Sequence, residues 1–220
     1  MLGKRVIPVV VAAMLLLTAC GAPEYEYVKN SDHKTYFKIP STWEKVNQDS
    51  LDEWAVGADP SSATAKIRDQ LLWTVAYDAD ADDPAVSHVY GMLPTPKPVA
   101  WAKVEQLLPE QSDSVSFDAL RNAVMPFTTD ARDAATQAGS MLTDFEPLRD
   151  EVLTPEKGLH GVRVVFNYSL LGQLHTFDLT ALVNDDASLL YMLFIRCTAK
   201  CYADRADELE GIVTSFTVRS

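Results

Sequence analysis

Apolar and polar residues alternate most clearly in the last third of the chain. Between residues 161 and 170 every second residue is apolar, which gives a strand one apolar face: Val162, Val164, Phe166, Tyr168 and Leu170. A turn at residues 171–173 (Leu-Gly-Gln) follows. The next stretch alternates again, and its apolar positions also share one face: Phe177, Leu179, Ala181 and Val183. This pattern predicts a β-hairpin with one face buried.

The run Leu189–Cys197 (LLYMLFIRC) is apolar on both faces. Such a strand is typical of the centre of a sheet that is covered on both sides. Apolar residues at helical spacing follow, with Leu209 and Ile212 predicted to face inward, and Phe216–Val218 is predicted to be a short last strand. The order of elements predicts an α+β fold, built on an antiparallel β-sheet that helices cover on both faces.

The first part of the folded domain is predicted to contain strands separated by polar turns. The strand candidates are Tyr36–Ile39, Trp43–Val46, Leu71–Tyr77 and His88–Leu93. The residues before them, Gly21–Lys34, are polar and show no periodicity. They are interpreted as a tether of at most about 45–50 Å when fully extended.

Helical spacing is predicted between these strands and the hairpin. It begins after three closely spaced prolines, with Val99, Val104 and Leu107 on one face, and Ser116 is predicted to cap a second helix. An alanine-rich third helix is predicted at residues 130–142. The sequence therefore predicts a single domain at residues 35–220 with a helical insertion at about residues 98–142. The insertion is expected to cover the second face of the sheet, and a ligand groove at that seam is one of two alternatives. The other is that the insertion only completes the core.

The first twenty residues show the three zones of a secretory signal. Lys4 and Arg5 precede a twelve-residue apolar run, and Leu17-Thr-Ala-Cys20 follows it directly. This ending resembles the bacterial lipobox, in which the cysteine is lipidated and becomes the first residue after cleavage. The apolar run is shorter than the roughly 20 residues that a membrane-spanning helix needs. We therefore expect residues 1–19 to be removed and lipid on Cys20 to anchor the protein to the extracytoplasmic face of the cell membrane. An ordinary signal peptide with an incidental cysteine is the alternative.

The chain is acidic, with a formal net charge of −12. Removing residues 1–19 takes away Lys4 and Arg5 but no acidic residue, so 31 acidic and 17 basic residues remain and the charge becomes −14. A surface of this charge repels phosphate backbones, which argues against nucleic acid as a partner. The expected partners are the membrane, through the lipid on Cys20, and an envelope protein, glycan or lipid.

Two cysteines remain once Cys20 is assigned to lipid, namely Cys197 and Cys201. Cysteines of exported proteins most often pair, and the spacing here is not that of a C-x-x-C redox motif. Two cysteines without supporting histidines also make a poor zinc site. A structural disulfide between Cys197 and Cys201 is the favoured interpretation.

Two segments resemble PsbP-like domains. The opening residues 36–43 (YFKIPSTW) are similar to the "strand, Ile-Pro, turn, Trp" start of that family, and residues 208–218 (ELEGIVTSFTV) look like its closing helix and last strand. The fold includes PsbP, Ran-binding Mog proteins and actinobacterial lipoproteins of the LpqN type. The resemblance covers about residues 35–93 and 145–220. It implies a non-enzymatic binding or assembly module without shared catalytic residues.

The acidic turn at residues 78–83 resembles the start of a calcium loop, with Asp78, Asp80 and Asp82 at alternate positions. Asp83 stands where that loop needs Gly, and Val89 stands where it needs Glu. A solvated turn is therefore the favoured interpretation, and neither a metal nor a cofactor is expected.

No catalytic motif is recognisable in the sequence. No G-x-S-x-G elbow and no Gly-rich phosphate loop occurs. The four histidines form no H-E-x-x-H motif: His33, His88, His160 and His175. Trp54, Trp73 and Trp101 are candidates to line a glycan or lipid groove, although such aromatics are more often plain core. The favoured function is a non-catalytic binding or scaffolding module of the envelope, with no catalytic residue named. The alternative is an envelope hydrolase with a dispersed site.

Overall fold

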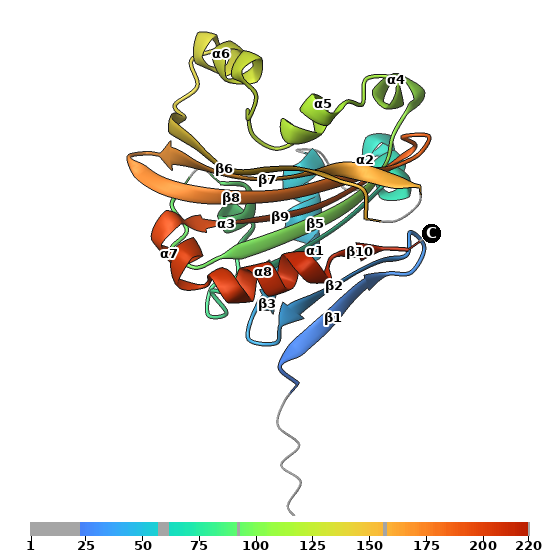
Figure 1. Cartoon of the computed structure of the whole chain (residues 1–220). Coiled ribbons are helices and arrows are strands. Elements are labelled where there is room, and N and C mark those ends of the chain that lie inside the picture. Colours follow the sequence, from blue (N-terminus) through green and yellow to red (C-terminus); the bar gives the residue numbers. More distant parts are fainter. Residues whose placement is uncertain (1–22, 57–61, 92, 156–157, 220) are drawn as a thin grey trace, which may run out of the picture.

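The computed structural model describes residues 23–56, 62–91, 93–155 and 158–219, which form two antiparallel sheets (Figure 1). The larger sheet has seven strands, in the spatial order β3 (Glu44–Lys45), β4 (Leu72–Asp78), β5 (Val99–Gln106), β9 (Leu189–Thr198), β8 (Gln173–Asn184), β7 (Leu159–Leu170) and β6 (Thr143–Leu153). The smaller sheet has the order β1 (Tyr25–Asn30), β2 (Thr35–Pro40) and β10 (Thr217–Val218). The predicted α+β class with an antiparallel sheet is confirmed.

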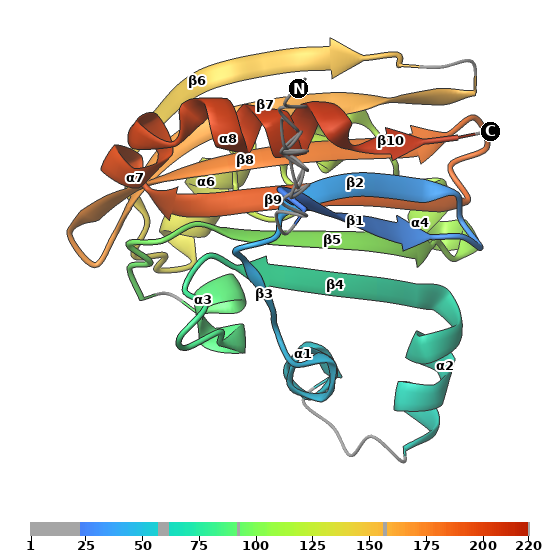
Figure 2. The same ribbon diagram turned by 90° about the horizontal axis from the view of Figure 1, so that it is seen from below.

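The predicted hairpin and central strand are also confirmed. Strands β7 and β8 pair from Leu159–Asn184 to Leu170–Gln173 across a two-residue turn. Leu171 and Gly172 in that turn both have positive φ, as in a type I′ hairpin. Strand β9 is the fourth of the seven strands and pairs with β5 on one side and β8 on the other, as Figure 2 shows from below.

Alternate residues of the long strands face two different cores. One core contains the residues that the alternation placed together on β7 and β8, with Met192 and Phe194 of β9 added to them. The other core receives Leu193, Ile195 and Cys197 from the opposite face of β9. Because both sets are buried, the sheet is covered on each face, as the double apolar run of β9 predicts.

The helix α8 (Ala206–Ser215) covers the second core, and its Leu209 and Ile212 are fully buried there. The small sheet packs beside it, through residues such as Phe37 and Ile39 of β2. The predicted helical cover is therefore present on this face, and a three-stranded sheet lies beside the helix in the same layer (Figure 2). The short helix α7 (Ala199–Asp204) links β9 to α8.

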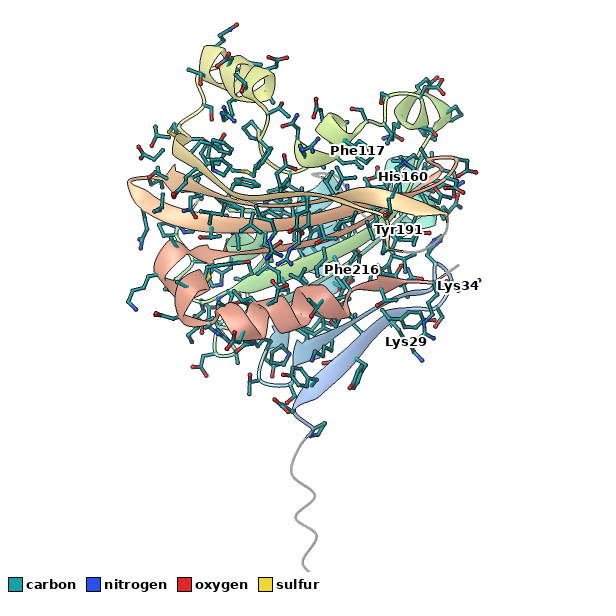
Figure 3. All side chains as sticks on the ribbon, viewed as in Figure 1. Lys29, Lys34, Phe117, His160, Tyr191 and Phe216 are labelled. Carbon is teal, nitrogen blue, oxygen red and sulfur yellow. A yellow bond between two sulfur atoms is a disulfide. The ribbon has the colours of Figure 1, made fainter. Side chains whose placement is uncertain are left out.

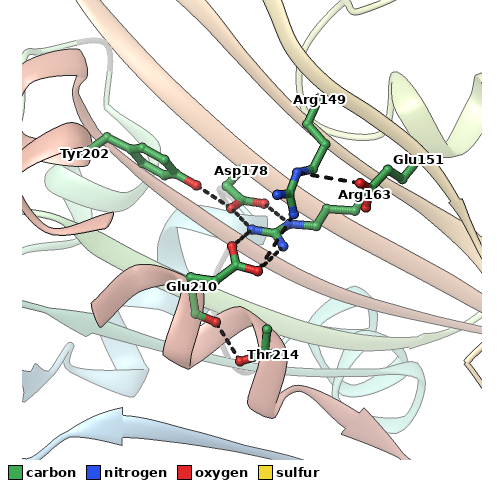
Figure 4. A network of polar contacts seen from close by, with 7 residues as sticks. All are labelled: Arg149, Glu151, Arg163, Asp178, Tyr202, Glu210 and Thr214. Atoms are coloured by element: carbon green, nitrogen blue, oxygen red, sulfur yellow. Dashed lines mark hydrogen bonds and ion pairs between the residues drawn. The ribbon is translucent and has the colours of Figure 1, made fainter. Parts of the chain in front are cut away.

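A buried ionic network fixes α8 to the sheet (Figure 4). Arg163 of β7 donates from Nε and Nη2 to Asp178 of β8, at 3.1 and 2.8 Å, and also to Glu210 of α8 at 2.9 and 2.6 Å. Tyr202 of α7 donates to the same aspartate at 2.6 Å. Burial opposes the charge on Arg163, but the hydrogen bonds to Glu210 and Asp178 raise its pKa.

The helical insertion is shorter than the predicted residues 98–142, because the prediction of its first helix is wrong. Residues 99–106 form strand β5, which lies between β4 and β9 and is an integral part of the sheet. The remaining residues hold three short helices, α4 (Pro109–Ser112), α5 (Phe117–Arg121) and α6 (Thr129–Gln137), and Ser116 caps α5 by accepting from Ala119 N–H. We call residues 107–142 the helical segment.

The helical segment and two other helices cover the first core. Leu120 and Phe127 of the segment are buried in it, together with Leu51 of α1 (Gln48–Val56) and Val89 of α3 (Val86–Tyr90). Phe117 of α5 lies edge-on to the ring of His160 of β7, 6.1 Å away between centroids (Figure 3). The prediction that inserted helices supply a cover therefore holds for part of this face.

Two further expectations about local structure are wrong. Residues 88–91 are not a strand, since helix α3 runs through Tyr90 and Gly91 caps its end, and residue 92 lies outside the described residues. Much of the expected tether is strand β1, which pairs with β2 from Tyr25–Pro40 to Asn30–Thr35, so the folded domain starts before Thr35. The strand predicted at Leu71–Tyr77 is present as β4, which begins one residue later, at Leu72, directly after helix α2 (Ala63–Leu71). Among the described residues, no helix combines the length and apolar character that crossing a membrane requires.

A candidate apolar ligand site

An apolar pocket of about 260 Å³ lies where the helical segment, α1 and α3 meet the seven-stranded sheet. We call it the seam pocket. Its lining comes from α1, α3, the loop after α5, and strands β5, β7, β8 and β9: Trp54, Val89, Tyr90, Gly91, Trp101, Ala123, Val124, Met125, Leu170, Phe177, Phe194 and Arg196. Eleven of these twelve residues are apolar, aromatic or glycine, and the twelfth is an arginine. Such a lining, apolar with a single charged group, is typical of small-molecule sites.

A continuous row of aromatic rings leads from solvent into the pocket. Trp54 stacks on Tyr90 with 4.1 Å between centroids and 9° between planes, and 53% of Trp54 is exposed. Tyr90 meets Trp101 edge-on at 5.5 Å, and Trp101 meets Phe194 in the same way at 6.4 Å. Burial raises the pKa of Tyr90, so its phenol stays neutral. The rings give the pocket rigid walls and an exposed aromatic rim.

Helix α3 is placed by polar contacts on both sides. Asp78, buried at the end of β4, accepts from the Nδ1 atom of His88 at 2.7 Å and from the Ala85 N–H at 3.3 Å. The carbonyl oxygen of His88 accepts from Arg196 Nε at 2.9 Å. Gly91 follows the helix so closely that a Cβ atom there would lie 2.2 Å from the Ser87 oxygen. These contacts hold Val89 and Tyr90 against the sheet.

The acidic turn is therefore only partly the solvated turn that the sequence predicts. Asp78 is 1% exposed and organises the turn by accepting from Asp80 N–H at 2.8 Å as well as from α3. Asp80 itself pairs with Lys97 at 2.8 Å, and this hydrogen bond lowers the pKa of Asp80. Among the described residues, no group of three or more His, Cys, Asp or Glu side chains is placed to hold a metal ion.

The three candidate tryptophans lie at two different sites. Trp54 and Trp101 line the seam pocket, whereas Trp73 lines a polar groove of about 490 Å³ between β1, α1 and β4. Tyr77 in that groove donates to Glu26 at 2.9 Å, and burial raises the pKa of Tyr77. The groove carries carboxylates, lysines and amides along its walls, so it differs in character from the seam pocket.

Two of the three cysteines with a predicted role lie among the described residues. Cys20 lies outside the described residues, so its lipidation stays a prediction. Cys197 at the end of β9 and Cys201 of α7 are bonded to each other, with Cα atoms 6.0 Å apart. The side chain of Thr198 between them caps α7 by accepting from Cys201 N–H. The bridge thus ties the central strand to the first turn of the closing helices.

The histidines stay apart, as their sequence positions indicate. His175 is fully buried and holds two backbone groups, since Nε2 accepts from Thr95 N–H at 3.3 Å and Nδ1 lies 3.1 Å from the Gln173 oxygen. Burial lowers the pKa of His175, so the ring is neutral. His88 is hydrogen-bonded to Asp78, and His160 lies against Phe117.

No family model matches the sequence. No curated protein matches it either. Solved structures do resemble the chain. The solution structure of cyanobacterial PsbP (CyanoP) from Synechocystis sp. PCC 6803 is 11% identical, covers 91% of this chain and 96% of its own, and gives a TM-score of 0.51. The fold is PsbP-like.

Two further matches have lower TM-scores. The structure of LpqN, described as involved in cell envelope biogenesis of Mycobacterium tuberculosis, is 16% identical and has a TM-score of 0.43, covering 89% of this chain and 91% of that one. The Saccharomyces cerevisiae Ran-binding protein Mog1p is 9% identical and has a TM-score of 0.41, covering 88% and 95%. The PsbP-like resemblance read from the sequence at residues 36–43 and 208–218 is confirmed at the level of fold.

Sequence reasoning missed the charged residues inside the PsbP-like sheet. Arg163, Asp178 and Arg196 are each at most 5% exposed. Each interrupts an otherwise apolar or alternating strand, and that interruption is a usable signal, since charged residues are rarely fully buried unless they are paired. Arg163 and Asp178 pair with each other, whereas Arg196 lines the seam pocket.

Proposed function

We propose that this protein is an envelope lipoprotein whose PsbP-like domain binds an apolar, lipid-like ligand in the seam pocket without transforming it. Lipid on Cys20 anchors the domain to the extracytoplasmic face of the cell membrane. The observation that carries the proposal is the pocket itself, with its eleven apolar, aromatic or glycine lining residues and its exposed tryptophan rim. Stacked rings supply a large apolar contact area at fixed geometry, which favours binding.

The apolar lining favours a lipid over a glycan. Sugars need several polar partners, and the seam pocket offers one charged side chain among twelve lining residues. A glycan would fit the polar groove around Trp73 better, since Glu26, Lys45 and Gln48 line it. The concave shape of the seam pocket, between sheet and helices, also suits a small ligand better than a protein surface.

The hydrolase alternative has one supporting fragment, the Asp78–His88 pair. An aspartate that orients a histidine is part of many catalytic triads. Among the described residues, however, no hydroxyl or thiol is hydrogen-bonded to Nε2 of His88, and Asp78 is engaged by two backbone N–H groups of its own turn. The pair therefore supports α3 and supplies no assembled nucleophile.

The binding test uses the chain from Gly21 to Ser220, which keeps every described strand and helix. This protein is incubated with an envelope lipid extract, and the retained lipid is identified by native mass spectrometry. Ala123→Phe adds bulk to an exposed position of the pocket lining and is expected to abolish retention. Trp73→Phe, in the polar groove, is the matched control and is expected to retain lipid as the unchanged chain does.

Two results would contradict the proposal. Lipid retention that survives Ala123→Phe would place the ligand elsewhere on the protein. Turnover of a p-nitrophenyl ester that is lost in His88→Ala would favour the hydrolase alternative and refute the non-catalytic assignment.

A further inference from the structure

Arg196 is the charged residue of the seam pocket, and its position in the sheet is well defined. It lies on β9 between Val99 of β5 and Phe177 of β8. Met192 and Phe194 precede it at alternate positions and face the first core, so Arg196 lies on the same face of the sheet. Its exposed fraction is 4%. A guanidinium group is therefore held at the apolar wall of the pocket.

The hydrogen bonds of Arg196 leave much of its donor capacity unused. Nε donates to the His88 oxygen at 2.9 Å, and Nη2 lies 3.5 Å from the Leu93 oxygen. Arginine has five N–H donors, so two carbonyl groups cannot satisfy it. No carboxylate pairs with Arg196 anywhere in the described part of the chain, and burial lowers its pKa to about 10. It nevertheless stays charged at neutral pH.

Among the residues that the structure describes, Arg196 lacks the carboxylate partners that the other buried arginine, Arg163, has. Arg163 is buried to the same degree, and two carboxylates, Asp178 and Glu210, neutralise it. A buried charge without a counter-ion is unfavourable, and proteins usually pair it. The chain has 31 acidic residues, yet none of those described is placed beside Arg196. A bound anion would supply the absent partner.

A buried donor at the pocket has no partner. The Nε1 atom of Trp101 is buried and has no hydrogen-bond partner among the described residues. Buried indole N–H groups usually find an acceptor. Trp101 lines the seam pocket as Arg196 does, so the lining carries an unsatisfied N–H group together with a guanidinium group that no described carboxylate pairs with.

We infer that the ligand of the seam pocket is a carboxylic acid with an apolar body, of the fatty-acid class, whose carboxylate pairs with Arg196. This inference rests on the proposed function and specifies the chemistry of the ligand. A guanidinium matches the planar geometry of a carboxylate and binds it with charge-assisted hydrogen bonds. The apolar body contacts the rings of Tyr90, Trp101 and Phe194. A cavity of about 150 Å³ holds benzene, so 260 Å³ admits a group larger than one ring.

The test compares dodecanoate with its neutral counterparts, dodecanol and methyl dodecanoate, on the chain from Gly21 to Ser220. Binding is followed by tryptophan fluorescence, since two of the four tryptophans line the pocket. Dodecanoate is expected to bind roughly 10- to 100-fold more tightly than either neutral compound, as the loss of a charged hydrogen-bonded pair predicts. This comparison needs no variant, so it does not depend on the folding of a mutant.

The variant Arg196→Met removes the charge and keeps an apolar side chain of similar length. It is expected to lose the preference for dodecanoate, so that the acid and the alcohol bind with equal affinity, whereas Arg196→Lys keeps part of the preference. Equal affinity for the acid and the alcohol in the unchanged chain would overturn the role of Arg196 and leave the proposed apolar site intact. Failure of all three compounds to bind would refute the apolar site itself.

Discussion

Replacing Asp178 by Asn tests whether the buried network holds the closing helices on the sheet. Asp178 is 1% exposed and accepts from Arg163 twice, at 3.1 and 2.8 Å, and from Tyr202 at 2.6 Å. Asparagine has nearly the same shape, but it removes the negative charge and offers one acceptor oxygen in place of two. The NH₂ group of the asparagine amide is itself a donor, and it would face the N–H or O–H donors of Arg163 and Tyr202.

The expected loss follows from the partners that remain. Removing one member of a buried ion pair typically costs about 3–5 kcal/mol, because the other charge is left uncompensated. Arg163 retains Glu210, at 2.9 and 2.6 Å, and that carboxylate is 44% exposed. The expected destabilisation is therefore near the lower limit, about 3 kcal/mol. For a domain of this size, it corresponds to a fall in Tm of about 6–12 °C.

The measurement is equilibrium unfolding in urea, followed by circular dichroism, on the chain from Gly21 to Ser220. Glu151→Gln is the matched control, since Glu151 is 52% exposed and its ion pair with Arg149 is 3.8 Å long. A surface pair of this kind contributes about 0–1 kcal/mol, so the control is expected to unfold almost as the unchanged chain does.

The double variant Arg163→Met, Asp178→Leu separates pairing from mere burial. When both charges are removed, no buried charge is left uncompensated, since Glu210 is 44% exposed and keeps Arg149 at 3.7 Å. The double variant is therefore expected to be more stable than Asp178→Asn. A coupling energy above about 1.5 kcal/mol is expected from the corresponding cycle of single variants. The reasoning fails if Asp178→Asn costs less than about 1 kcal/mol, or if the two single changes simply add.

Three further predictions concern anchoring, the disulfide and acid stability. Cys20→Ala is expected to release the protein from the membrane fraction, and retention of the lipid label would contradict this. Cys197 and Cys201 are bonded to each other and are therefore expected to resist alkylation until reduction, and intact-mass analysis of exported protein is the measurement that checks this. Burial lowers the pKa of His175, so below pH about 6.5 the unfolded chain binds a proton that the native state does not. The free energy of unfolding should fall there by up to about 1.4 kcal/mol per pH unit. The fall is expected to be less steep in His175→Gln, whereas His33→Gln is expected to show the same slope as the unchanged chain.

The sequence predicts the part of the fold in which side-chain pattern and burial agree. Strands β7 and β8 alternate because one face of each packs on the first core, and their turn carries a glycine at positive φ. Strand β9 is apolar on both faces because cores lie on both sides of it. The cap at Ser116 is equally local, since its side chain binds a backbone N–H three residues ahead.

The missed elements are those in which local pattern and tertiary context disagree. Residues 99–102 are apolar at every position, so periodicity does not separate a buried strand from a helix there. Strand β6 is an edge strand with mostly exposed residues, Pro147 and two register shifts, and therefore shows no clear alternation. Strand β1 exposes Tyr27 and two charged residues, and its pairing with β2 is what makes it a strand. For each of them, the partner strand supplies information that the segment itself lacks.

The candidate site was predictable in its location but not in its chemistry. Trp54 and Trp101 were candidates, and a seam between sheet and inserted helices was one of two alternatives. The role of Arg196 depends on which groups surround it, and these come from α3, the chain around Leu93 and strand β8. Segments separated by about a hundred residues meet there, and no local motif encodes such a meeting.

The position of β1 bears on how an anchored domain would present its ligand. Tyr25 begins β1 only five residues after Cys20, and five extended residues span at most about 18 Å. Lipid on Cys20 would therefore hold the start of β1 close to the membrane surface. Strand β1 packs with β2 and α8 on one face of the large sheet (Figure 1). The seam pocket lies on the other face. Because packed sheets are about 10 Å apart, two layers would separate the ligand from the anchored side. Under the proposed anchoring, the ligand site therefore lies on the side of the domain that faces away from the anchored strand.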